Sequence, residues 1–183
     1  MFVAHAVDLL GNADILCVTA PQVVKKAHRA YLEAGADIIR TNTVRANPIV
    51  QGKFRFENMA YDIALAGARI ACESIAEYND DILQCKTGKL GQTLERKYVA
   101  GVMGPAEDSA DVGFRELVDA YSEVVRGLLD GNADILLLDS FRNLLNVKAA
   151  LHAVFKVCSE RQELVPVMVS GEIAEAGAGT LAG

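Results

Sequence analysis

Small and polar residues recur at four places where an apolar run of the sequence ends. They are Thr41-Asn42-Thr43, Gly104-Pro105, Asp139-Ser140 and Ser170-Gly171. Each apolar run has the length and composition of a β-strand, so the four sets lie at the carboxyl ends of successive strands. Parallel α/β enzymes bind their substrates at that end of the sheet. Any one set fits an ordinary strand-to-loop transition, but four together favour a small-molecule site.

Two periodicities alternate along the chain and predict the elements that would position these residues. Helices, with apolar residues at intervals of three and four, are expected at residues 21–34, 58–78, 114–129 and 144–158. Strands are expected at residues 36–41, 98–103, 134–139 and 165–170. Thr19 and Gln22 are expected to form a capping box at the first helix, and Gly35 to end it. This alternation requires a parallel sheet with right-handed crossovers, so the fold class is α/β.

Pattern alone does not separate an open doubly wound sheet from part of a closed barrel. The polar strand ends favour the barrel, although open sheets bind ligands at the same edge. An internal echo supports repeated units, because Gly35-Ala36-Asp37-Ile38-Ile39 recurs as Asn132-Ala133-Asp134-Ile135-Leu136. Gly11-Asn12-Ala13-Asp14-Ile15-Leu16 has similar letters without a preceding helix, and coincidence explains it equally well.

Cysteine and histidine spacing does not predict a metal site. Cys17, Cys72, Cys85 and Cys158 are far apart, without any Cys-x-x-Cys pair. His5, His28 and His152 are equally isolated, and the last two fall on predicted helices. Buried or incidental thiols and packed or solvent-facing imidazoles are therefore expected.

A phosphate-binding loop is also disfavoured. Residues 177–182 match Gly-x-Gly-x-x-Ala, but this fingerprint needs a strand directly before it and a helix after it. Six residues separate the match from the last predicted strand, and one residue follows it. A nucleotide-binding domain is therefore a weak alternative.

The amino-acid composition limits the classes of protein to which the chain can belong. The 183 residues are 51% hydrophobic, which is enough for one core and one domain, yet no apolar run is long enough to span a bilayer. The net charge is −6 with dispersed basic residues, which argues against nucleic-acid binding. Residues 1–5 have no signal-peptide character, so a cytoplasmic location is expected. Residues 1–18 are expected to be an irregular lead-in, and residues 171–183 a Gly/Ala-rich end.

Several stretches of the chain resemble the homocysteine S-methyltransferase family, above all the homocysteine-binding domain of cobalamin-dependent methionine synthases. Residues 28–43 are similar to the second-strand signature of that family. Further similar stretches are residues 98–105, 134–139, 146–151 and 166–171. The resemblance covers nearly all the chain from about residue 9 onward.

This resemblance implies an incomplete (β/α)8 TIM barrel, about strands two to five with their helices. It implies methyl transfer to the zinc-bound thiolate of homocysteine, forming methionine, because zinc keeps the thiol deprotonated at neutral pH. Cobalamin and methyltetrahydrofolate would be bound only by other modules of a full-length enzyme. In the site that the resemblance implies, Asp139 receives the amino group of homocysteine. The opening of the barrel around this site would be shaped by Thr41, Asn42, Thr43, Gly104, Pro105 and Ser170.

Departures from the family limit what this chain is expected to do. The usual first-strand loop, of Asp-Gly-Ala-Met-Gly-Thr type, has no counterpart before Gly11, and the three cysteine ligands of zinc fall beyond Gly183. Arg40, Val44 and Ser140 stand where the family has Glu, Phe and Thr, and Asp139 stands where it has Glu. We therefore expect no metal ligand and no catalytic residue here, and no activity of the isolated chain.

Two classes of function remain open after these departures. The chain is either a piece of a methyltransferase or a diverged, non-catalytic binding or structural α/β domain. In both cases an incomplete barrel leaves strand edges open, and these edges predict self-association. The apolar residues expected on its inner face are Ile38, Val99, Val102, Ile135, Leu137 and Val167.

Overall fold

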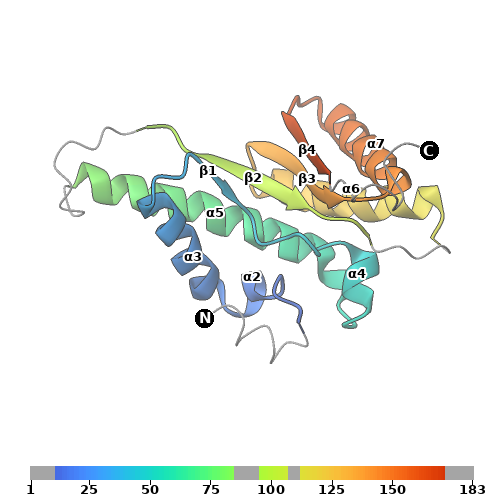
Figure 1. Ribbon diagram of the computed structural model, residues 1–183, viewed down its shortest axis with the longest axis horizontal. Coiled ribbons are helices and arrows are strands. Elements are labelled where there is room, and N and C mark those ends of the chain that lie inside the picture. The colour runs from blue at the N-terminus through green and yellow to red at the C-terminus, as the bar shows by residue number, and fades with distance from the viewer. Residues whose placement is uncertain (1–10, 85–94, 107–111, 172–183) are drawn as a thin grey trace, which may run out of the picture.

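A computed structural model describes residues 11–84, 95–106 and 112–171. Figure 1 shows strands and helices alternating along the chain, as the sequence pattern predicts. In chain order the elements are α2 (Leu16–Thr19), α3 (Pro21–Glu33), β1 (Ile38–Arg40), α4 (Pro48–Gly52), η1 (Glu57–Met59), α5 (Ala60–Leu83), β2 (Tyr98–Met103), α6 (Phe114–Asp130), β3 (Ile135–Phe141), α7 (Leu144–Arg161) and β4 (Val167–Gly171). Residues 1–10 of the expected lead-in and the Gly/Ala-rich residues 172–183 lie outside the described part.

The four strands form one parallel sheet in the order β1-β2-β3-β4. Ile39 is level with Val99, Gly101 with Leu136, and Leu137 with Met168. Chain order and sheet order therefore coincide, and each connection carries at least one helix. The predicted α/β class and parallel sheet are confirmed.

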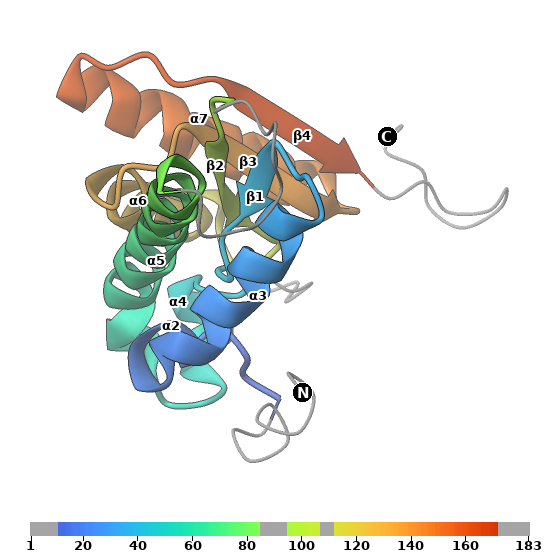
Figure 2. The ribbon, with the colours of Figure 1, turned by 90° about the vertical axis from the view of Figure 1, so that its left-hand side faces the viewer.

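Helices cover one face of this sheet. In Figure 2, α3, α5, α6 and α7 follow one another around the same side of the strands. Gly101 points to that side, since a Cβ atom built on it would lie 3.1 Å from Leu128 of α6. Because side chains alternate along a strand, Val99 and Val167 also face the helices. The prediction that Val99 and Val167 lie on the inner face of the sheet is therefore wrong. The other four residues predicted for the inner face do lie on the face that the helices leave open: Ile38, Val102, Ile135 and Leu137.

The core between sheet and helices is built around α6. Its buried residues follow intervals of three and four and include Leu117, Tyr121, Val124 and Leu128. Gly127 lets α6 approach α5 closely, because a Cβ there would lie 2.6 Å from the Tyr61 carbonyl oxygen. No helix among the described residues has the length and apolar content needed to cross a membrane.

The start of α3 differs from the prediction. Its N-cap is Ala20, which makes no side-chain cap bond, and Pro21 occupies the first turn. The Thr19 hydroxyl instead donates to the Ile15 carbonyl 3.1 Å away, because Thr19 closes the short helix α2. The predicted capping box is therefore wrong. Gly35 ends the helix as predicted, with a φ of +96°.

The segment after β1, where the sequence pattern predicts neither a helix nor a strand, contains the helix α4. Asn47 caps it by accepting a hydrogen bond from the Ile49 amide at 2.9 Å, and Pro48 begins it. Asn-Pro therefore marks a helix start here rather than a turn. Helix α5 also runs to Leu83, five residues beyond its expected end.

The three echoed sequences share one backbone feature. Gly11, Gly35 and Asn132 have φ angles of +85°, +96° and +66°. The second and third lead into strands β1 and β3, whereas the first leads into α2. The Gly11 copy thus shares the left-handed turn of the other two and not the strand.

Candidate functional site

Thr41 and Thr43 bond the end of β1 to β2. The Val102 amide donates to the Thr41 hydroxyl at 2.8 Å, and the Thr43 hydroxyl donates to the Val102 carbonyl at 2.7 Å. The two hydroxyl oxygens are 2.6 Å apart. Because the Thr43 hydroxyl donates its hydrogen to Val102, the Thr41 hydroxyl is the donor between the two. Both side chains are buried. Their hydroxyls therefore fix the strand ends and are not presented to solvent.

Asn42 ties the start of the described chain to the same strand end. Its Nδ2 donates to the Ala13 carbonyl at 2.8 Å, and the Cys17 thiol donates to the Asn42 carbonyl at 3.2 Å. These bonds hold the segment before α3 against the end of β1. Like Thr41 and Thr43, Asn42 positions the rim of the site.

Gly104 lies where the end of β2 meets the loop after β1. Its amide donates to the Val44 carbonyl at 2.8 Å, and a Cβ atom would lie 2.6 Å from that same oxygen. A side chain at this position would therefore clash with the backbone of Val44 as well as with its side chain. Pro105 follows half-buried, and the Ala106 amide donates to the Tyr121 hydroxyl at 2.7 Å.

Asp139 lies at the carboxyl end of β3 and forms an ion pair with Arg40 of β1. The Arg40 side chain is 52% exposed and that of Asp139 is 14% exposed. Ser140, the next residue, has a φ of +61°, and the pairing with β4 shifts between Leu138 and Phe141. A left-handed serine costs on the order of 1–3 kcal/mol, so the strand end is held in a specific, strained shape.

Ser170 is the most exposed of the predicted site residues. Leu138 pairs with Val169 and Phe141 with Gly171, so Ser170 lies beside the irregular stretch at Asp139 and Ser140. It belongs to the outer strand β4 and faces solvent. The structure thus gathers the predicted residues at one end of the sheet, as their positions after the strands predict.

Asp14 is a buried ionisable group near this rim that the sequence interpretation missed. Its Oδ2 accepts the Arg45 amide at 2.6 Å. Burial raises the pKa of the Asp14 carboxyl to about 6, and the Arg45 backbone contact only partly offsets this effect. The echo beginning at Gly11 was the only signal in the sequence that pointed to this segment.

Two neighbouring contacts extend the buried polar region around Asp14. Asn12 and Gln51 exchange amide hydrogen bonds of 2.8 and 3.2 Å. Gln51 also donates to the Arg45 carbonyl at 2.8 Å. These bonds fasten the segment before α2 to the loop and helix that follow β1.

The described residues do not fit a zinc site. They contain no group of three His, Cys, Asp or Glu side chains placed to hold a metal ion. Burial, with a smaller contribution from Asp14, raises the pKa of the Cys17 thiol to about 12, which disfavours the thiolate that zinc requires. Cys72 and Cys158 are also free thiols, while Cys85 and His5 lie outside the described residues.

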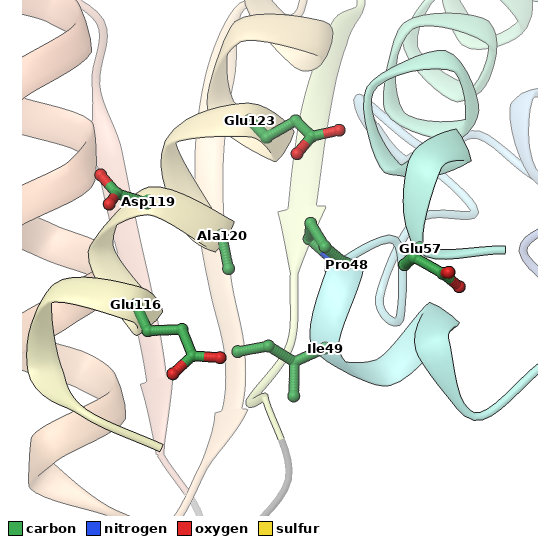
Figure 3. Close-up of a pocket in the computed structure, with 7 residues that line it drawn as sticks. All are labelled: Pro48, Ile49, Glu57, Glu116, Asp119, Ala120 and Glu123. Carbon is green, nitrogen blue, oxygen red and sulfur yellow. The ribbon is translucent and has the colours of Figure 1, made fainter. Parts of the chain in front are cut away.

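An acidic hollow of about 600 Å³ lies on the outside of the sheet, between α4, η1 and α6. Figure 3 shows that Glu116, Asp119 and Glu123 come from α6 and Glu57 from η1, and that their carboxylates point in different directions. Asp119 pairs with Lys156 at 3.4 Å, and Glu123 accepts the Tyr61 amide at 3.3 Å. The hollow is therefore lined by solvated and already paired carboxylates, and it is no ligand site.

Comparison with known proteins agrees with the arrangement of these elements. A model of the homocysteine S-methyltransferase family matches residues 3–183. Among solved structures, the homocysteine methyltransferase MmuM from Escherichia coli in its oxidized form has a TM-score of 0.67 at 19% identity, over 86% of this chain and 53% of MmuM. Its metallated form has a TM-score of 0.67 at 18% identity, over 93% of this chain and 59% of MmuM.

The chain thus spans between half and two thirds of the length of these structures. At this level of identity the likeness concerns the fold. A four-stranded parallel sheet with helices on one face, matching about half of the longer protein, is an incomplete (β/α)8 barrel. The expected fold is confirmed.

Proposed function

Because the chain belongs to the homocysteine S-methyltransferase family, we propose that its strand ends form the homocysteine-binding side of a methyl-transfer site. The observation that carries this proposal is the carboxylate of Asp139. It lies at the carboxyl end of β3, mostly shielded from solvent, where barrel enzymes hold their substrates. A carboxylate in this place suits the ammonium group of an amino acid.

Around Asp139 the other strand ends have supporting roles. The bonds of Thr41 and Thr43 to Val102 hold β1 and β2 in register, and the Gly104 contact with Val44 closes the loop between them. Ser170 lies beside Asp139 on the neighbouring strand and offers an exposed hydroxyl. We propose that these groups shape the mouth, while Asp139 alone supplies charge for the ligand's amino group.

Arg40 has to leave Asp139 before an ammonium group can take its place. The guanidinium already neutralises this carboxylate, and its side chain is half exposed, so the pair is open to exchange. Binding therefore replaces one ion pair with another, and the loss of the Arg40 contact offsets part of the free energy that the new pair contributes. We expect weak affinity for homocysteine.

The chemistry of methyl transfer needs a thiolate as nucleophile. Its sulfur attacks the methyl carbon, and the donor leaves with the electron pair of the broken bond. A thiol with a pKa near 8.5 is mostly protonated at neutral pH, and zinc is the group that deprotonates it in this family. The described residues do not fit zinc, so we propose that this chain binds substrate and does not catalyse the reaction by itself.

A non-catalytic role is the second candidate function, and the Arg40–Asp139 pair is the observation that favours it. Arg40 is already paired with the carboxylate of Asp139 that would receive the substrate's ammonium group, so it opposes binding. In this alternative the chain is a diverged α/β domain that retains the fold alone. Cobalamin and methyltetrahydrofolate, if used at all, would be held by other parts of a longer enzyme.

Calorimetric titration of the chain with L-homocysteine distinguishes the two candidates. We expect weak binding that Asp139→Asn removes, because the amide cannot pair with an ammonium group. Asp119→Asn is the matched control, since Asp119 is an exposed carboxylate on the outer face of α6. Equal binding by the wild type and Asp139→Asn would exclude Asp139 from the site, and no binding at all would favour the non-catalytic domain.

A further inference from the structure

Tyr121, in the middle of α6, has a buried hydroxyl that bonds to two other parts of the chain. The hydroxyl accepts a hydrogen bond from the Ala106 amide at 2.7 Å and donates one to Oδ1 of Asn146 at 2.8 Å. Ala106 follows the end of β2, and Asn146 is in the first turn of α7, the helix that follows β3. All three residues are buried. One hydroxyl therefore ties the chain that leaves β2 to the chain that leaves β3.

The chemistry of this hydroxyl suits both bonds at once. Burial raises the pKa of the Tyr121 hydroxyl well above its usual range, and the Ala106 contact only partly offsets this effect. The hydroxyl therefore keeps its hydrogen at neutral pH, so it donates to Asn146 while it accepts from Ala106. Without the hydroxyl oxygen, the Ala106 amide and the Asn146 carbonyl would each lose this partner inside the core.

The ring of Tyr121 packs against Phe141, which follows Asp139 by two residues. The two ring centroids are 6.1 Å apart, and the ring planes are inclined by 41°. Phe141 is fully buried, and both rings belong to the core between the sheet and the helices. Tyr121 therefore contacts the end of β3 directly, as well as through α7.

The irregular end of β3 is what brings Phe141 to this side of the sheet. Leu138 is level with Met103 and faces the helices, and regular alternation would turn Phe141, three residues later, to the open side. The left-handed Ser140 and the register shift between Leu138 and Phe141 reverse this alternation. Asp139 is thus held between two buried side chains that both face the helices.

We propose that Tyr121 is a positioning residue for the homocysteine site, because its contacts hold the end of β3 in the shape that directs the Asp139 carboxylate. Its ring holds Phe141 in place, and its hydroxyl fixes Ala106, directly after the Gly104-Pro105 turn. Tyr121 lies on the helical side of the sheet and Asp139 on the open side, so Tyr121 acts through the strand end and not by contact with a ligand. The inference rests on the proposed function, since Asp139 is the residue that it orients.

Tyr121→Phe tests this inference, because it keeps the ring and removes only the hydroxyl. L-homocysteine and its analogue without the amino group, 4-mercaptobutanoate, are titrated calorimetrically into the folded variant and the wild type. The wild type should prefer homocysteine by at least about twofold, and the preference should fall toward one in the variant, because Asp139 no longer points at the ammonium group. A merely structural role would weaken the binding of both ligands equally and leave the preference unchanged.

Tyr61→Phe is the matched control. It removes the same atom from a tyrosine whose hydroxyl donates to Oδ2 of Asp130 at 2.8 Å, at the end of α6 that leads to the start of β3. This variant should keep the wild-type preference. Asn146→Ala removes the acceptor and leaves Tyr121 in place, so it should lower the preference as Tyr121→Phe does, and it provides the test if Tyr121→Phe does not fold. A wild-type preference in Tyr121→Phe, or an equal fall in Tyr61→Phe, would contradict the inference.

Backbone amide NMR signals without ligand distinguish a failure of this inference from a failure of the proposed function. Tyr121→Phe should shift the signals of residues 139–141 together with that of Ala106, whereas Tyr61→Phe should leave them unchanged. Unchanged signals of residues 139–141 in Tyr121→Phe would overturn the inference even where homocysteine binds through Asp139. Shifted signals in a protein whose wild type has no preference for homocysteine would instead overturn the proposed function, and Tyr121 would then order the strand end without serving this ligand.

Discussion

Arg40 and Asp139 form an ion pair that bridges two strands with a third strand between them. Arg40 is level with Ala100 of β2, and Asp139 is on β3 at the end where the strand becomes irregular. Both side chains lie on the face of the sheet that the helices leave open. The carboxylate proposed to receive the substrate's ammonium group is therefore already paired with a residue of the same chain.

Removing this arginine should strengthen homocysteine binding. An exposed ion pair contributes about 0–1 kcal/mol, so Arg40→Ala should raise the affinity by up to about fivefold. Arg40→Lys, which keeps the charge, should bind nearly as the wild type does. Calorimetric titration measures the effect. Weaker binding by Arg40→Ala would show that the guanidinium holds the ligand's carboxylate instead of competing for Asp139.

Substitution of Gly104 should destabilise the fold by strain at the strand ends. The added Cβ of Gly104→Ala would lie 2.6 Å from the Val44 carbonyl oxygen, and such overpacking costs about 1–3 kcal/mol. Gly52→Ala is the matched control, since its nearest neighbour would be a side-chain atom of Glu57 at 3.9 Å. Urea unfolding compares the two. Equal unfolding free energies would show that the loop moves freely around Gly104.

Asp14→Asn should remove a pH-dependent cost to stability. The folded-state pKa of Asp14 is about 6, above its ordinary value of 3.8, so the folded state binds the extra proton. Wild-type stability is therefore lost as the pH rises through this window. The variant should match the wild type near pH 4 and exceed it by up to about 3 kcal/mol at pH 7.

Urea unfolding at several pH values tests this prediction, with Asp119→Asn as the control. Asp119 is an exposed carboxylate on α6, so Asp119→Asn makes the same chemical change at a position away from the buried segment. Parallel profiles for the wild type and Asp14→Asn would show that the Asp14 carboxyl titrates as an exposed one does.

The chain should not retain one zinc ion per molecule after dialysis. A catalytic zinc site needs three protein ligands, and burial together with Asp14 keeps the Cys17 thiol protonated at neutral pH. Elemental analysis should find far less than one equivalent. One equivalent that Cys17→Ser, Cys72→Ser or Cys158→Ser removes would reveal a site formed with residues outside the described part.

Elements with a long periodic pattern could be predicted from the sequence. Strand β2 has the predicted bounds, and α6 and α7 begin at the first residues of their apolar stripes. The pattern identifies them because a helix of four or five turns, or a strand buried on both faces, repeats its contacts many times. The predicted site residues that follow such strands, among them Thr41 and Asp139, lie at the strand ends for the same reason, and their role in a site stays a prediction.

Short elements and long-range contacts could not be predicted in this way. Helices α2 and α4 have four and five residues, which is too short for a period to show. The Arg40–Asp139 pair joins residues 99 positions apart, and only the sheet register brings them together. The environment of Asp14 also depends on a residue that is distant in sequence, because the amide of Arg45 donates its hydrogen bond.

The most direct test of the proposed site is a thermodynamic cycle in which the ligand's ammonium group and the carboxylate of Asp139 are removed singly and together. L-homocysteine and 4-mercaptobutanoate, which differ in that group alone, are titrated into the wild type and into Asp139→Asn. A charge-assisted contact contributes about 1.5–3 kcal/mol and breaking the Arg40 pair costs about 0–1 kcal/mol, so the wild type should prefer homocysteine by at least about twofold. The variant should bind both ligands equally weakly. The same preference in both proteins, or none in the wild type, would contradict the account.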